Sequence, residues 1–199
     1  PRPTAAPTAN PQPHGANMAS RTELIVALDV ATLDEAAAVV HTLGDAVTWY
    51  KIGKQLFTRF GPAAVQTVKA AGKHVFLDLK FHDIPNTVAQ AVRSAASLGA
   101  DITNVHASGG RAMLKAAADA ARETGLIVLG VTVLTSMDAA ELRAVGITAS
   151  PEEQVVRLAR LAQAAGVPGV VCSALEIAAL RQACGPDFLL VVPGIRPAG

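Results

Sequence analysis

Four charged residues lie in or beside apolar stretches of the chain, where a charge is unfavourable. Asp78 and Lys80 interrupt one apolar run, Asp83 follows shortly after it, and Lys51 lies in an earlier run. A buried charge is tolerated when it is paired or coordinated. Because Asp78 and Lys80 are two residues apart, a regular strand would point both side chains to the same face. We therefore expect these groups to form an alternating array of ammonium and carboxylate side chains.

Two interpretations of this array are open. It could be a buried ion-pair network that ties neighbouring strands together, or it could be the working part of an active site. A buried ion pair is weak support for stability, because apolar packing of similar volume usually serves as well. Charged groups in perturbed surroundings gather at functional sites instead. The residue types therefore favour an active site.

The elements that must position these residues follow one repeated pattern. A short run rich in Val, Ile and Leu is followed by an Ala-rich stretch, a glycine and the next run. Such near-continuous apolar runs are typical of strands that are buried on both faces of a sheet. The seven runs are 23–29, 47–53, 74–80, 101–107, 127–134, 169–173 and 189–195.

Helix signals fill the stretches between these runs. Three pairs have the Ser/Thr-x-x-Glu spacing of a capping box, which marks a helix start: Thr32 with Glu35, Ser150 with Glu153, and Ser173 with Glu176. The glycines expected to close the helices are Gly44, Gly72, Gly99, Gly125, Gly166 and Gly185.

Seven consecutive strand–helix units leave two architectures, an open doubly wound sheet and a closed (β/α)8 barrel. The first run ends at Asp29 without the G-x-G-x-x-G turn that is typical of the doubly wound sheet. We therefore predict an α/β fold, a (β/α)8 TIM barrel whose eighth strand is missing from this chain. In such a barrel the chemistry lies at the carboxyl ends of the strands, where Asp29, Thr135 and Arg196 also fall.

Composition excludes several other classes of protein. The chain has 199 residues, 51% of them hydrophobic, and a net charge of +1 without a block of like charges. Neither a nucleic acid nor an anionic membrane surface is predicted as a partner. No apolar run reaches the roughly 20 residues of a membrane span. Cys172 and Cys184 have no metal-ligand spacing and no signal peptide is visible, so we expect unpaired thiols and a cytoplasmic location.

The two ends of the chain differ from the repeats. Residues 1–20 carry five prolines among Ala, Thr and Asn, which predicts a disordered Pro/Ala-rich leader, with Met18 as the expected natural start. The barrel domain is then expected to occupy residues 21–199. Because the chain stops directly after an apolar run, we expect that C-terminal sequence is missing.

Residues 78–87 read DLKFHDIPNT. This stretch resembles the D-x-K-x-x-D-I-P-N-T signature of the orotidine 5′-phosphate decarboxylase family. The D-x-K-x-x-D core is shared with sugar-phosphate decarboxylases and aldolases of the wider superfamily, whereas the I-P-N-T extension is specific to the orotidylate enzymes. Further matches follow in the expected order at residues 27–29, 51–53, 133–136 and 193–197.

The resemblance implies a cofactor-independent enzyme of pyrimidine biosynthesis that removes CO₂ from orotidine 5′-monophosphate to give uridine 5′-monophosphate. No metal is implied. By the motif match, Lys80 stabilises the negative charge left on C6 and delivers the proton that quenches it. Asp78 would sit beside the departing carboxylate. Lys51 and Asp83 would hold the array in place and meet ribose hydroxyls.

The same resemblance implies further residues that bind the substrate. Asp29 would bind a ribose hydroxyl, Thr135 and Ser136 would lie near the pyrimidine, and Pro193 and Arg196 would lie on the phosphate side. In the family, the counterparts of Asp83, Ile84 and Thr87 reach the neighbouring subunit's site, which implies a homodimer with composite active sites.

Two alternative functions remain at this stage. A related barrel could decarboxylate a sugar phosphate with Mg²⁺, or the chain could be a non-catalytic barrel that binds a phosphorylated ligand. The I-P-N-T extension argues against the first alternative. The intact set of Lys51, Asp78, Lys80 and Asp83 argues against the second.

Overall fold

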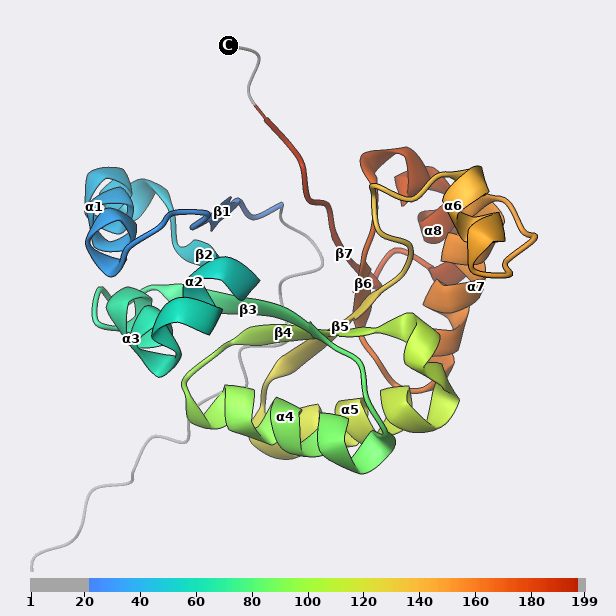
Figure 1. The fold of residues 1–199 in the computed structure, drawn as a ribbon, viewed down its shortest axis with the longest axis horizontal. Coiled ribbons are helices and arrows are strands. Elements are labelled where there is room, and N and C mark those ends of the chain that lie inside the picture. The colour runs from blue at the N-terminus through green and yellow to red at the C-terminus, as the bar shows by residue number, and fades with distance from the viewer. Residues whose placement is uncertain (1–21, 197–199) are drawn as a thin grey trace, which may run out of the picture.

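A computed structural model describes residues 22–196 of the chain. One parallel sheet contains seven strands, and each strand pairs with the next one along the chain. The strands are β1 (Ile25–Ala27), β2 (Trp49–Gly53), β3 (His74–Phe81), β4 (Ile102–His106), β5 (Ile127–Val131), β6 (Gly169–Val171) and β7 (Leu189–Val191). Figure 1 shows that the sheet curls, with the helices along its outer side. The described residues therefore form an open (β/α)7 half-barrel, which confirms the predicted TIM-barrel class.

Eight α-helices lie between these strands in the described part of the chain, two of them after β2 and two after β5. They are α1 (Leu33–Leu43), α2 (Lys54–Phe60), α3 (Pro62–Lys69), α4 (Pro85–Ser97), α5 (Gly110–Thr124), α6 (Ala139–Ala144), α7 (Pro151–Ala164) and α8 (Ile177–Cys184). None of the described helices has both the length and the apolar character that crossing a membrane requires. The predicted leader, residues 1–20, lies outside the described residues, so the domain division stays a prediction.

The three predicted capping boxes are all present. At the start of α1, Glu35 N–H donates to Thr32 Oγ1, and the Glu35 carboxylate accepts from Thr32 N–H. The box at Ser150 begins α7, whereas the box at Ser173 begins a short 3-10 turn before α8. Each box satisfies backbone N–H groups that a helix start leaves without partners. The local sequence thus determines where these elements begin.

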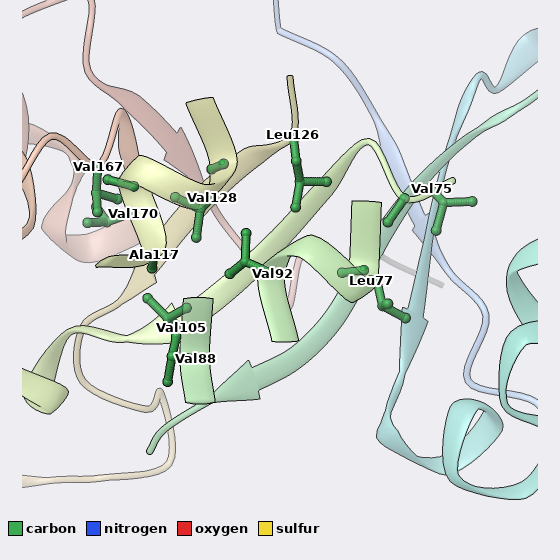
Figure 2. Packing of buried hydrophobic residues seen from close by; sticks show 14 of the residues in the cluster. Val75, Leu77, Val88, Val92, Val105, Ala117, Leu126, Val128, Val167 and Val170 are labelled. Atoms are coloured by element: carbon green, nitrogen blue, oxygen red, sulfur yellow. The ribbon is translucent and has the colours of Figure 1, made fainter. Parts of the chain in front are cut away.

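The main core lies between the sheet and its helices. It is built from Val, Leu, Ile and Ala side chains of both layers, and their burial is the dominant favourable contribution to folding. Figure 2 shows part of this layer, in which Val88 and Val92 of α4 lie among Leu77 and Val105 of the sheet. A second cluster, around Phe76, Ile102 and Leu129, contains no member of the helices. Burial on both faces explains why the strands read as continuous apolar runs.

Most predicted strands extend beyond the observed ones, and two of them continue three or more residues past the carboxyl end of the observed strand. The predicted run 127–134 continues three residues past β5, and the run 189–195 continues four residues past β7. There the chain leaves the hydrogen-bonded ladder and becomes loop, so Leu134 and Ile195 are exposed at 38% and 70%. The apolar residues that follow β5 and β7 therefore belong to loops at the barrel mouth and not to the strands.

Candidate active site

An irregularity in β3 sets the geometry of the barrel mouth. Leu77 pairs with Thr103 of β4, but the next pair joins Phe81 to Val105. Three residues of β3, 78–80, therefore stand opposite Asn104, and a β-bulge of this kind re-aims side chains near a functional site. Lys80 has φ +53°, and no other non-glycine residue in the described range has a positive φ. The regular-strand argument for Asp78 and Lys80 is therefore wrong, although the two side chains do meet.

Four side chains at the carboxyl ends of the first three strands form a chain of alternating charge. Lys80 Nζ lies 2.5 Å from Asp78 Oδ1, and Lys51 Nζ lies 3.6 Å from Asp78 Oδ2. Lys51 Nζ also lies 3.3 Å from Asp29 Oδ1. The order along this charge chain is thus Asp29, Lys51, Asp78, Lys80. Exposure of the side chain is lowest at Asp78, at 11%, and rises to 25% at Lys80 and to 67% at Asp29, so the charge chain is most buried at Asp78 and reaches the surface at Asp29.

Asp78 is the buried centre of the charge chain. Burial alone would raise the pKa of its carboxyl group. Hydrogen bonds from Lys80 and Asn104, together with the charges of Lys80 and Lys51, outweigh burial and hold the pKa of Asp78 below its ordinary value. The carboxylate is therefore charged at neutral pH, between two ammonium groups.

Asp83 does not join this charge chain, contrary to the predicted array of Lys51, Asp78, Lys80 and Asp83. Its Oδ1 accepts a hydrogen bond of 2.6 Å from the backbone N–H of Ile84, and the residue is exposed. Within residues 22–196, Asp29 takes the fourth place instead. Ile84, 66% exposed, and Thr87, also exposed, lie beside Asp83 at the start of α4. These three predicted site residues are therefore exposed on the surface of the chain.

The remaining predicted site residues lie on loops at the same end of the sheet. Thr135 and Ser136 follow β5, and Pro193 and Arg196 follow β7; all four are exposed. Within the described range, no hydrogen bond or ion pair joins their side chains to the charge chain. They follow the carboxyl ends of β5 and β7, whereas the charge chain lies at the carboxyl ends of β1 to β3.

Sequence reasoning did not single out two residues that contact the charge chain. Asn104 of β4 is fully buried, and its Nδ2 donates to Asp78 Oδ1 over 2.7 Å. Gly53 ends β2, and a Cβ atom there would lie 3.3 Å from Lys51 Nζ. The one available signal for Asn104 was its amide inside the run 101–107, where it did not stand out because Asp101, Thr103 and His106 are polar as well.

The charge chain can supply fixed electrostatic stabilisation and a proton. An ammonium group that is held beside a reaction centre stabilises developing negative charge without reorganisation. Across residues 22–196, no three His, Cys, Asp or Glu side chains cluster in a way that could hold a metal ion. Fold and site together define a (β/α)-barrel enzyme with a lysine–aspartate centre at the carboxyl ends of its strands.

Comparison with known proteins identifies the family of this barrel. Residues 22–199 match the orotidine 5′-phosphate decarboxylase / HUMPS family. An orotidine 5′-phosphate decarboxylase of Chromohalobacter salexigens is 54% identical over 178 residues, covering 88% of this chain and 75% of the relative. One of Moorella thermoacetica is 52% identical over 190 residues, covering 92% and 75%. The chain belongs to this family.

Solved structures agree with this assignment. The crystal structure of orotidine 5′-phosphate decarboxylase from Lactobacillus acidophilus has a TM-score of 0.81 at 38% identity, covering 88% of this chain and 82% of that one. An uncharacterized conserved protein from Geobacillus kaustophilus has a TM-score of 0.80 at 41% identity, covering 85% and 82%. The resemblance drawn from residues 78–87 is thus confirmed at the level of the family.

Proposed function

We propose that this chain decarboxylates orotidine 5′-monophosphate to uridine 5′-monophosphate, a step of pyrimidine biosynthesis. The observation that carries the proposal is the contact of 2.5 Å between Lys80 Nζ and Asp78 Oδ1, with Lys51 on the other side of Asp78. Curated relatives that are at least half identical to the chain carry the name of this activity. The family includes enzymes that catalyse other reactions, so membership alone does not identify the reaction. The charge chain and the named activity of these relatives together support decarboxylation of orotidine 5′-monophosphate.

The reaction needs a group that stabilises an anion in the plane of the pyrimidine ring. When the bond between C6 and the carboxylate carbon breaks, CO₂ leaves and the electron pair remains on C6. That pair cannot delocalise well, so fixed positive charge must stabilise it. In the proposal the Lys80 ammonium does this and then transfers a proton to C6, and the neutral amine regains a proton from water. No cofactor enters this scheme.

Asp78 has a second part in the proposal. Its carboxylate keeps the Lys80 ammonium in place, and a bound substrate would bring a like charge close to it. That repulsion is relieved as CO₂ leaves without charge, although such ground-state effects are secondary to stabilisation of the carbanion. The lowered pKa of Asp78 keeps the group charged for this role.

Other residues would hold the substrate. We assign Asp29 and Lys51 to the ribose hydroxyls, because both lie where the charge chain reaches the surface. Thr135 and Ser136 would read the pyrimidine from the loop after β5. Pro193 and Arg196 would face the phosphate side. Binding energy from such remote groups is what an enzyme uses to reach its transition state.

Composite sites in a homodimer are also part of the proposal. Asp83, Ile84 and Thr87 are exposed, and Asp83 makes no ion pair with its own charge chain in the described residues. An apolar side chain that is 66% exposed beside an unpaired carboxylate fits a surface covered by a second subunit. These three residues would then complete the site of the partner subunit.

Decarboxylation of orotidine 5′-monophosphate, followed by ultraviolet absorbance and by release of CO₂, tests the reaction. We expect uridine 5′-monophosphate as product and an unchanged rate in excess EDTA. A Mg²⁺-dependent sugar-phosphate decarboxylase would instead act on a keto-gulonate phosphate and lose its activity in EDTA. That result, without turnover of the orotidylate, would contradict the proposal.

Mixing of inactive variants tests the composite sites. A Lys80→Ala chain and an Asp83→Ala chain are each expected to be inactive, whereas hybrid dimers would carry one intact site. Equal mixing after dissociation and reassociation should therefore restore about a quarter of the wild-type rate per chain, because half of the dimers would be hybrids with one working site. Self-contained sites would give no recovery. The cytoplasmic location stays a prediction, which fractionation of cells would test.

A further inference from the structure

One uncharged residue, Asn104, contacts both Asp78 and Lys80 of the charge chain. Asn104 lies in the middle of β4 and is 0% exposed. Its Nδ2 donates to Asp78 Oδ1 over 2.7 Å, and its Oδ1 accepts from the backbone N–H of Lys80 over 2.8 Å. Because the two ends of an amide differ, one as donor and the other as acceptor, these bonds fix the orientation of the side chain.

The second of these bonds falls on an unfavourable backbone conformation. Lys80 has φ +53°, and a residue with a Cβ atom keeps such a conformation only where its surroundings hold it. Asn104 stands opposite residues 78–80, where β3 has more residues than β4 between its paired positions. The amide therefore supplies a hydrogen-bond partner to the bulge at the point where the ladder does not.

Aspartate, serine and alanine each fail to make both contacts. An aspartate at position 104 would place a second carboxylate against Asp78 and repel it. A serine is too short to reach both groups, and an alanine would leave a buried N–H without a partner. The side chain is also fully desolvated, so water does not replace it readily.

We propose that Asn104 is a positioning residue for the decarboxylation. One amide holds the Asp78 carboxylate and the left-handed backbone of Lys80 together, and so aims the Lys80 ammonium at the reacting carbon. The inference rests on the proposed decarboxylase function. Since Asn104 acts through Asp78 and Lys80 and not through the phosphate or ribose, its effect belongs to the chemical step.

Asn104→Ala separates this role from a general effect on folding. We expect kcat to fall about 100-fold, as for a small misplacement of a reacting group, while KM changes by less than about threefold. Thr103→Val is the matched control, because Thr103 is also 0% exposed and its Oγ1 donates to the Leu77 carbonyl over 2.9 Å. It removes a buried hydrogen bond from the same strand but should leave kcat within about threefold.

Two further variants keep the test decisive. Asn104→Ser should fold more readily than Asn104→Ala and still lose at least about tenfold in kcat, since it cannot hold both partners. Asn104→Asp has nearly the same shape, so activity in this variant would show that shape and not the amide matters. Thermal unfolding of all variants identifies any that do not fold. The proposal is overturned by a kcat near wild type in Asn104→Ala, by activity in Asn104→Asp, or by an equal loss in Thr103→Val.

A crystal structure of Asn104→Ala tests the geometry without reference to activity. We expect the distance from Lys80 Nζ to Asp78 Oδ1 to exceed 4 Å, or φ of Lys80 to leave the left-handed region. An unchanged pair with the same backbone would overturn the inference even in an inactive protein. An inactive wild type with the expected displacement would overturn the proposed function instead.

Discussion

Two aspartates lie at opposite ends of the half-barrel, Asp78 buried and Asp101 half-buried, and each forms an ion pair with at least one lysine. At the mouth, Asp78 contacts Lys80 and Lys51. At the floor, Asp101 precedes β4 and contacts Lys69 over 3.0 Å, His74 over 3.2 Å and the backbone N–H of Val75 over 2.7 Å. The pKa of each carboxyl group is lowered although burial opposes this, so both are charged at neutral pH.

The two clusters differ in what surrounds the carboxylate. Asp101 accepts from a backbone N–H of the neighbouring strand, and His74 stacks on Trp49 with the ring centroids 4.6 Å apart. These contacts tie helix and strands together without an unusual backbone. Asp78 instead lies in a bulge beside the left-handed Lys80 and between two ammonium groups. A strained backbone that brings charged side chains together indicates a functional site. Paired charges at the floor of a barrel, where the amino ends of the strands lie, indicate a contribution to stability.

The largest expected effect is that of Lys80→Ala. Loss of both electrostatic stabilisation and the proton donor should lower kcat by at least about 10⁴-fold. Thermal unfolding should remain close to that of the wild type, because Lys51 and Asn104 still contact the Asp78 carboxylate after Lys80 is removed. Steady-state kinetics and calorimetry measure the two quantities. Substantial residual turnover would remove Lys80 from its assigned role.

Asp101→Asn should show the reverse pattern. Loss of the charge at the floor weakens contacts to Lys69 and His74, which should lower the free energy of unfolding by about 1–3 kcal/mol. The melting temperature should then fall by roughly 2–12 °C, while kcat stays within about twofold. Denaturant unfolding and the decarboxylation assay check this variant. A loss of activity without a loss of stability would erase the distinction between the two clusters.

Gly53→Ala should have a smaller effect at the mouth. A Cβ atom at this position would lie 3.3 Å from Lys51 Nζ and 3.5 Å from Asp29 Oδ1. The flexible end of the lysine can move aside, so we expect kcat/KM to fall by about three- to tenfold with little change in stability. Steady-state kinetics at several substrate concentrations measure it. An increase in kcat/KM would show that the contact between Lys51 and Asp29 opposes binding.

The smallest effect concerns stability in acid. A carboxyl group whose pKa is lowered on folding stabilises the protein above its unfolded pKa of about 4, and this stabilisation is lost as the pH falls through the folded pKa. The pKa values of Asp78 and Asp101 are both lowered in the folded protein, so both groups contribute in this direction. The free energy of unfolding should therefore decrease below about pH 4, and less steeply in Asp101→Asn than in the wild type. Identical slopes would show that Asp101 does not contribute.

The sequence predicted the fold because strand and helix signals repeat along it. Capping boxes at Thr32, Ser150 and Ser173 are local and formed as expected. The ends of β5 and β7 were not predictable, because apolar loop residues such as Leu134 resemble strand residues until their pairing is known.

For the site, the sequence predicted the meeting of Asp78 and Lys80 but not how it occurs. A bulge depends on pairing with β4, which spacing along β3 does not contain. For the same reason Asn104 was missed, since its contacts come from another strand. Asp83 was placed in the charge chain from proximity in sequence, whereas the turn at Ile84 directs it to the surface.

The affinity for an analogue of the carbanion tests the central claim most directly. A uridine 5′-monophosphate analogue with an anionic oxygen at C6 resembles the charge that the mouth should stabilise. Calorimetry should show that the wild type binds this analogue at least about 10³-fold more tightly than uridine 5′-monophosphate, as expected for an analogue of the transition state, and that Lys80→Ala loses most of this preference. An equal preference in the variant, or none in the wild type, would contradict the account.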